Sequence, residues 1–141
     1  MNVRSFRLSD YVAVNGLLEN ILSEACYEET VEAFVRQLSL DSGLVLVAEQ
    51  DDLIVGVLIG TVDNNKGIFY RIAVHAEHQR RGIGRTMIKA MKSRFEQRRV
   101  SGIYVSVDVH NEPILAVYES AGYPVAESAK YIGKLAIVSG S

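Results

Sequence analysis

Three apolar runs separated by two short polar turns limit most strongly how this chain can fold. The runs cover residues 43–49, 53–62 and 68–75, and the turns between them are 50–52 and 63–67. The runs are rich in β-branched and other apolar residues, a composition typical of strands. Because turns this short join only antiparallel neighbours, the pattern predicts an antiparallel meander of three strands.

Before the meander the sequence has mainly a helical period. A strand is expected at 3–8, and Ser9-Asp10 is an N-cap signal for a helix whose apolar residues run from Tyr11 to Leu22. A second, short helix is expected over 31–38, after Glu28-Glu29-Thr30.

After the meander, a long amphipathic helix begins at about Gly82 and a strand follows at 102–109. A last helix, 112–121, and two terminal strands, 125–128 and 134–139, complete the pattern. The succession of strand, long helix and strand requires a right-handed crossover between parallel strands. The sequence therefore predicts a single α+β domain over residues 1–141. Its mixed, twisted sheet combines an antiparallel meander with one parallel strand pair, and helices cover both faces.

The strongest chemical signal is the turn Gln79-Arg80-Arg81-Gly82-Ile83-Gly84, where the third strand of the meander meets the long helix. The first amides of a helix have no internal partner, and glycines allow a large anion to approach them. Arg80, Arg81 and Arg85 lie at the positive end of this helix dipole, where each cation is disfavoured by about 0.3–1 kcal/mol. A bound polyanion such as a pyrophosphate resolves that conflict. The segment matches neither a Walker A loop nor a full Rossmann fingerprint.

Composition limits the class of protein and the cellular compartment in which this site is expected. The net charge of −2 argues against a general nucleic-acid binder, and no apolar run approaches the roughly 20 residues of a membrane span. A single cysteine, Cys26, and the absence of a secretory signal favour a reducing cytoplasm. The cations are nevertheless concentrated in one segment, in which Glu96 is the only acid. They are Arg80, Arg81, Arg85, Lys89, Lys92, Arg94, Arg98 and Arg99.

Two motifs resemble those of the GNAT superfamily of N-acetyltransferases. The turn 79–84 is similar to its acyl-CoA motif, Q/R-x-x-G-x-G/A, and the preceding Ile72-Ala73-Val74 resembles its cofactor-facing strand. The family also has a signature in which an Asn precedes the run L-Y-E-x-x-G-F. Here it is matched by Asn111 and Val117-Tyr118-Glu119-Ser120-Ala121-Gly122-Tyr123, with Val117 for Leu and Tyr123 for Phe. The resemblance covers nearly the whole chain and implies that the parallel strand pair splays apart.

The resemblance implies an N-acyltransferase that works by direct attack in a ternary complex, without a metal. It moves an acetyl group from acetyl-CoA, or the acyl group of another acyl-CoA, to a primary amine. The resemblance places the pyrophosphate on the backbone amides of Arg81 through Arg85, with Gln79 at the start of the turn. It assigns the Val74 amide to the thioester carbonyl, Asn111 to the pantetheine arm and Tyr118 to protonation of the departing thiolate. The implied cofactor-binding set is Ile72, Ala73, Val74, Gln79, Arg80, Arg81, Gly82, Ile83, Gly84, Arg85, Asn111 and Tyr118, with Tyr118 also catalytic.

Several residues keep a second interpretation. Asn111 is also a good helix N-cap, and Tyr118 lies on the apolar stripe of its helix. The general base is open, because Ser106 stands where some relatives carry Glu. Three side chains are substitute bases: Asp108, His110 and His75.

The acceptor is also open. A small-molecule amine and a protein or peptide amine both fit the resemblance, and so does a monomer or a homodimer. Glu28 and Glu29 either line the acceptor site or form a capped, solvated helix start. An alternative function is a regulatory domain that binds acyl-CoA without catalysing a reaction.

Overall fold

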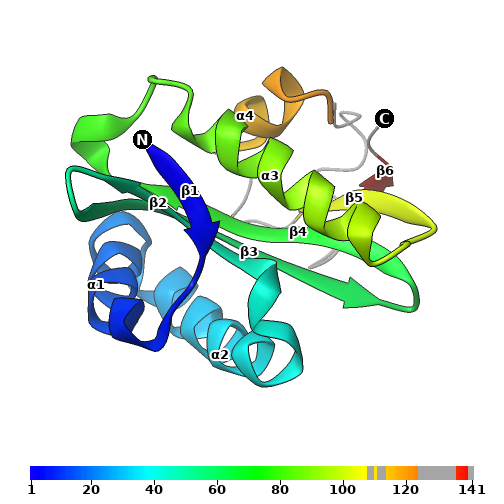
Figure 1. The fold of residues 1–141 in the computed structure, drawn as a ribbon, viewed down its shortest axis with the longest axis horizontal. Coiled ribbons are helices and arrows are strands. Elements are labelled where there is room, and N and C mark those ends of the chain that lie inside the picture. The colour runs from blue at the N-terminus through cyan, green and yellow to red at the C-terminus, as the bar shows by residue number, and fades with distance from the viewer. Residues whose placement is uncertain (108–109, 111–113, 124–135, 140–141) are drawn as a thin grey trace.

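The computed structural model describes residues 1–107, 110, 114–123 and 136–139 (Figure 1). A six-stranded sheet has its strands in sequence order, from β1 to β6. The strands are β1 (Asn2–Ser5), β2 (Val45–Gln50), β3 (Leu53–Asp63), β4 (Lys66–Val74), β5 (Gly102–Val107) and β6 (Ala136–Ser139). The helices are α1 (Tyr11–Ile21), α2 (Glu24–Asp41), α3 (Ile83–Gln97) and α4 (Leu115–Ser120).

The predicted meander of β2, β3 and β4 is confirmed, and both pairs are antiparallel. Each of its turns has two central residues in left-handed backbone. These are Asp51 and Asp52, with φ of 52° and 64°, and Asn64 and Asn65, with φ of 49° and 62°. Left-handed backbone at both central positions defines the type I′ turn, whose twist matches a two-residue hairpin. Asp and Asn adopt this backbone more easily than most residues.

Helices cover both faces of the sheet, as predicted: α1 and α2 on one face, and α3 and α4 on the other (Figure 1). The core under α1 and α2 contains Phe34 and Val57. The core under α3 and α4 contains Phe69, Met87 and Tyr118. Each face of the sheet is therefore covered by its own apolar core.

The second helix begins earlier than the sequence indicated. The helix predicted over 31–38 is confirmed, but its predicted length is wrong. α2 has 18 residues and starts after Ser23, whose hydroxyl accepts a hydrogen bond from the Cys26 amide at 3.2 Å. Its buried positions include the polar Thr30 and Gln37, so the apolar period alone is too short. Glu28 and Glu29 consequently lie inside the helix and do not cap its start.

Three glycines of the sheet let α3 lie close to it. A Cβ atom at Gly56 would lie 2.9 Å from the Met87 side chain, and one at Gly67 would lie 2.7 Å from the Phe95 ring. Gly60, between them, faces both Met91 and Phe95 at about 3.0 Å. Because these glycines have no side chains, the apolar stripe of α3 packs directly against the backbone of the sheet.

The parallel pair of β4 and β5 separates part-way along. Pairing runs from Lys66↔Gly102 to Phe69↔Val105, and β4 then continues to Val74 with no β5 partner among the described residues. A register shift between Ile59 and Gly60 of β3 adds an irregularity to β4 at the same level. The predicted splayed pair is confirmed. β6 pairs antiparallel with β5, whereas the strand expected at 125–128 lies outside the described residues.

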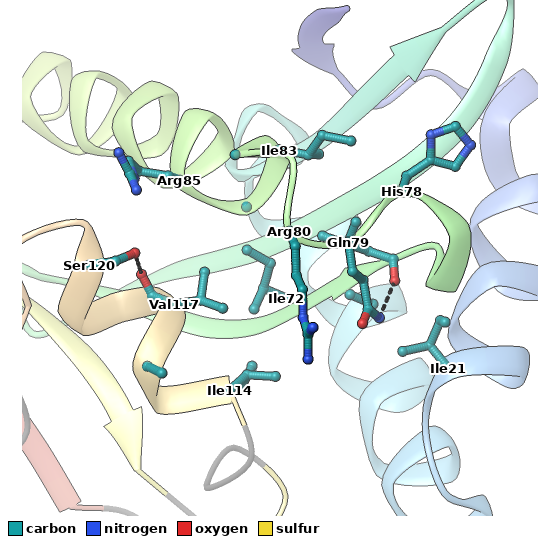
Figure 2. Close-up of a pocket in the computed structure, with 15 residues that line it drawn as sticks. Ile21, Ile72, His78, Gln79, Arg80, Ile83, Arg85, Ile114, Val117 and Ser120 are labelled. Atoms are coloured by element: carbon teal, nitrogen blue, oxygen red, sulfur yellow. Dashed lines mark hydrogen bonds between the residues drawn. The ribbon is translucent and has the colours of Figure 1, made fainter.

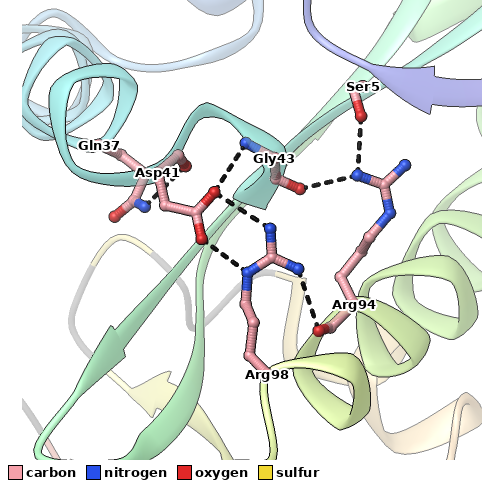
Figure 3. A network of polar contacts seen from close by, with 6 residues as sticks. All are labelled: Ser5, Gln37, Asp41, Gly43, Arg94 and Arg98. Atoms are coloured by element: carbon pink, nitrogen blue, oxygen red, sulfur yellow. Dashed lines mark hydrogen bonds and ion pairs between the residues drawn. The ribbon is translucent and has the colours of Figure 1, made fainter.

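Two arginines on the last turns of α3 tie that helix to the other layer (Figure 3). Arg98 makes two bonds to the Asp41 carboxylate, at 2.6 and 3.1 Å. Arg94 donates to the Ser5 hydroxyl at 2.7 Å and to the Gly43 carbonyl at 3.0 Å. These contacts join the ends of α2 and β1 to α3 beside the sheet.

Candidate functional site

The glycine turn leaves the first amides of α3 without helical partners. Gly82 caps the helix in left-handed backbone, with φ of 81°, and has no side chain that could bond to the helix. The first helical bond runs from the Thr86 amide to the Gly82 carbonyl, at 3.0 Å. The amides of residues 83–85 therefore project from the positive end of the helix, which has no acidic residue in its first turn. This arrangement suits an anion.

The two glycines of the turn have different roles. A Cβ atom at Gly82 would meet nothing within 4 Å, so the space above this residue is open and its positive φ explains the glycine. A Cβ atom at Gly84 would lie 2.9 Å from Val117 of α4 and 3.5 Å from Ile72 of β4. Gly84 thus serves the packing of α3 as well as exposing its own amide.

A cavity of about 560 Å³ lies beside the end of β4, beyond its last pairing with β5 (the fork), and its size is typical of a small-molecule site (Figure 2). It extends from the glycine turn along the end of β4 to α4 and to Ile21 at the end of α1. Its lining comprises Ile21, Ile72, Ala73, Val74, His78, Gln79, Arg80, Gly82, Ile83, Gly84, Arg85, Ile114, Ala116, Val117 and Ser120. Nearly all of the site residues predicted from 72–85 are therefore brought together, with Arg81 the exception.

The charges at the mouth of this cavity are positive. The exposed Arg80 and Arg85 line it, and the described part of the chain contains no ion pair that involves either of them. Arg94 and Arg98, by contrast, make the contacts of Figure 3. The structure thus separates two cations of the basic segment, which lie at the cavity, from two others that hold the layers together.

The end of β4 presents to the cavity a backbone edge that no described strand pairs with. Beyond Phe69 no described residue of β5 pairs with β4. The His75 amide donates to the Val55 carbonyl of β3 at 2.8 Å. Because successive residues of a strand direct their amides to opposite edges, the amides of Ile72 and Val74 face the fork. An extended chain with amide groups could pair there.

Comparison with known protein families identifies the family of this chain. The family model described as "Acetyltransferase (GNAT) family" matches residues 12–123, which is most of the chain. The protein belongs to the GNAT acetyltransferase family. It is an acyl-CoA-dependent N-acetyltransferase, and acetyl-CoA is its co-substrate.

Several proteins are similar to this GNAT acetyltransferase. "Acetyltransferase SG1711" of Sodalis glossinidius is 28% identical over 134 residues, which are 95% of this chain and 94% of that protein. The crystal structure of PaiA N-acetyltransferase from Thermoplasma acidophilum in complex with coenzyme A has a TM-score of 0.75 at 16% identity, covering 99% of this chain and 97% of its own. An aminoglycoside 6′-N-acetyltransferase from Acinetobacter haemolyticus has a TM-score of 0.72 at 18% identity, covering 96% and 99%. At these identities the structural matches show the shared fold.

The residues of the GNAT acetyltransferase fit acyl-CoA on their own geometry. The helix-start amides and two arginines suit the charge of a pyrophosphate, and the edge of β4 beside them, which no described strand pairs with, suits a chain that contains amide groups. The described residues contain no cluster of metal-ligating side chains and no helix long and apolar enough to cross a membrane.

Tyr118 lies in the core. Its side chain is 0% exposed, and its ring packs against Phe69 with centroids 5.7 Å apart. It is not part of the cavity lining, although Val117 on the same helix is. Asn111, the other residue implied by the second motif, lies outside the described residues.

Ser106, which stands where some relatives carry Glu, is 1% exposed. The described candidates for a base lie in different environments. His75 accepts a hydrogen bond at Nδ1 from the Glu77 amide, at 3.1 Å. His110 pairs through Nε2 with the Glu29 carboxylate, at 3.2 Å. Asp108 lies outside the described residues.

The sequence did not indicate the buried arginine at the fork. Arg71 is 1% exposed, donates through Nε to the Thr30 hydroxyl at 3.0 Å, and lies over the Tyr70 ring at 4.7 Å from its centroid. It faces α2, so it belongs to the layer opposite α3. Thr30 is 41 residues away in the sequence, and no sequence pattern near Arg71 indicates its hydrogen bond to Thr30.

Proposed function

We propose that the protein acetylates a primary amine by direct attack in a ternary complex, and that a small-molecule amine is the first acceptor to test. The observation that carries this proposal is the continuity of the cavity. It joins the free amides of α3 and the open edge of β4 to Ile21, on the layer of α1 and α2. Donor and acceptor can then approach the fork from opposite faces of the sheet.

On the donor side, we assign the pyrophosphate to the amides of residues 83–85, with Arg80 and Arg85 as its nearest cations. The amides of Ile72 and Val74 would bond to the pantetheine arm and to the thioester carbonyl. Asn111 would contact the same arm. A donor aimed at the carbonyl oxygen gains strength as negative charge develops there during attack.

The reaction itself needs two proton transfers. The amine nitrogen bonds to the thioester carbon, the carbon–sulfur bond breaks, and the sulfur leaves as a thiolate. We assign Tyr118 as the group that protonates this thiolate, because a phenol of pKa about 10 can donate to a thiolate whose thiol has a pKa of about 8.5 at modest cost. The proton lost by the amine goes to a base, for which His75 and His110 are the described candidates.

On the acceptor side, the proposal concerns the start of α2. Glu28 and Glu29 are exposed on this helix, and Glu29 pairs with His110. Two carboxylates there would favour a cationic amine. Charge reversal at both positions should then raise the acceptor KM at unchanged acetyl-CoA KM, and an unaltered acceptor KM would reject this part.

The deciding experiment incubates the protein with acetyl-CoA and a panel of amines, amino acids and peptides, and measures the release of free CoA. Release that depends on one class of acceptor supports the proposal and names that class. Tight CoA binding without acceptor-dependent release would instead support a regulatory domain.

A further inference from the structure

The side chain of Gln79 is turned back toward the sheet. Its Nε2 donates a hydrogen bond to the Val74 carbonyl at 3.0 Å, drawn as a dashed line in Figure 2. Val74 is the last residue of β4, and both residues line the cavity. The first residue of the glycine turn thus contacts the strand end that the donor is expected to reach.

This bond completes the fixation of one peptide unit. The Val74 carbonyl and the His75 amide belong to the same planar group. The amide end is held by β3, through the bond from His75 to the Val55 carbonyl at 2.8 Å. The carbonyl end is held by Gln79. The backbone of Val74 is therefore held from both edges of the strand.

The Val74 amide lies on the same edge as its own carbonyl, because one residue of a strand directs both groups to one side. That edge faces the fork, where no described residue of β5 pairs with β4 beyond Phe69. Gln79 bonds to the carbonyl, and the Val74 amide is the last donor on this edge of the strand that has no β5 partner among the described residues. A ligand on this edge can bond to the Val74 amide, but it cannot pair further along.

We propose that Gln79 is a positioning residue, which holds the Val74 carbonyl and so aims the Val74 amide at the acyl carbonyl oxygen of the donor. This inference rests on the proposed function, because it takes the Val74 amide as the group that polarises the thioester. It gives Gln79 a role other than binding the pyrophosphate. Misplacement of such a donor by a fraction of an ångström weakens it mainly in the transition state.

The test compares three substitutions of Gln79. Gln79→Met keeps the length of the side chain without a donor, Gln79→Glu replaces the donor with an acceptor, and Gln79→Arg restores an N–H donor. We expect kcat to fall by about tenfold or more in the first two variants and to recover in the third. The dissociation constant of CoA, measured by calorimetry, should stay within about twofold of wild type in Gln79→Met, because the amides of 83–85 are unchanged. Gln97→Met, at the other end of α3, is the control for loss of a glutamine.

An unchanged kcat in Gln79→Met would overturn the proposal, whether the CoA dissociation constant is unchanged (the first result) or raised (the second result). The second result would make Gln79 a phosphate ligand. A wild-type protein without acceptor-dependent turnover would reject the proposed function instead. The hydrogen-bond arrangement is then tested by amide exchange in NMR, where Gln79→Met should expose the His75 amide to faster exchange. Equal protection of that amide in both proteins would reject it.

Discussion

Two arginines occupy left-handed backbone, and only one of them faces the cavity. Arg80 has φ of 65° and lines the site, whereas Arg99 has φ of 54° and follows the end of α3. This backbone costs a residue with a Cβ atom about 1–2 kcal/mol, and glycine avoids most of that cost. An arginine retained at position 80 in spite of the strain suggests a role in binding.

Substitution of each arginine by glycine separates strain from binding. We expect Arg80→Gly to leave the free energy of unfolding unchanged or to raise it by about 0.5 kcal/mol, and to weaken CoA binding about fivefold through loss of a charged contact. Arg99→Gly should have the same effect on unfolding and none on CoA binding. Thermal unfolding and calorimetry measure the two quantities. Equal effects on CoA binding would remove Arg80 from the phosphate site.

The hydroxyl of Tyr118 can be tested against a neighbouring tyrosine. Tyr118→Phe should keep the CoA dissociation constant and lower turnover by up to about 10²–10⁴-fold, because it removes only the proposed proton donor. Tyr123→Phe is the matched control, since Tyr123 is also buried and its ring contacts the same Phe69 at 5.0 Å. Turnover unchanged across the pH range in Tyr118→Phe would leave this residue with a packing role.

At the residue scale, local sequence predicted the backbone of the site better than its side chains. The sequence placed the start of α3 at about Gly82, and Gly82 is the residue that caps this helix. The contacts of Gly84 with Val117 and of Glu29 with His110 join residues far apart in the chain. No local pattern contains such contacts, because tertiary packing creates them.

At the scale of elements, the packing of α3 on α4 depends on the missing side chain of Gly84. Gly84→Ala would place a Cβ atom 2.9 Å from the Val117 methyl, and we expect it to lower the free energy of unfolding by about 1–3 kcal/mol. Val117→Ala removes that methyl. The loss of unfolding free energy in the double variant should therefore be smaller than the sum of the losses in the two single variants. Urea unfolding of all four proteins measures this coupling. Additive losses would mean that the two residues do not meet.

The start of α2 shows where prediction of elements reached its limit. Ser23 caps this helix, and the buried positions that follow include Thr30, which bonds to Arg71 of β4. A polar residue buried by a distant partner breaks the apolar period from which helices are predicted. The meander and α3 were predicted to within a few residues, because their buried residues are apolar, with Arg71 of β4 as the charged exception among the described residues.

At the scale of the whole molecule, two carboxylates couple stability to pH. Hydrogen bonds from Arg98 lower the pKa of Asp41, and hydrogen bonds from Arg4 lower the pKa of Asp10. These groups bind protons less readily in the folded chain than in the unfolded chain. Their stabilisation is therefore complete above the unfolded pKa of about 3.9 and is lost as the pH falls through the lower folded pKa.

Substitution by asparagine should reproduce this loss at neutral pH. The Asp10 side chain is 8% exposed and that of Asp41 is 37% exposed, so solvent screens the second pair more. We expect Asp10→Asn to cost about 1–3 kcal/mol at pH 7 and Asp41→Asn less than about 1 kcal/mol. Both differences from wild type should shrink as the pH is lowered toward 2. Chemical denaturation over this range checks the order and the trend; differences independent of pH would contradict it.

The separation of the parallel strand pair could be predicted, but the residue at which the strands separate could not. The order of strand, helix and strand requires a parallel pair, and resemblance to the family implied that it splays. The point of separation after Phe69 depends on the register of β3, β4 and β5 together. Register in this part of the sheet is a property of three strands, so no single segment of sequence contains it.

The unpaired end of β4 has a consequence for the protein without its substrate. Backbone groups that lack a strand partner must bond to water or to a ligand. On our assignment, the extended arm of the donor substitutes for a strand, and the sheet is completed by a molecule that is consumed and replaced in every cycle. The donor then contributes to the architecture of the domain for as long as it stays bound, and each release of CoA returns part of the sheet to solvent.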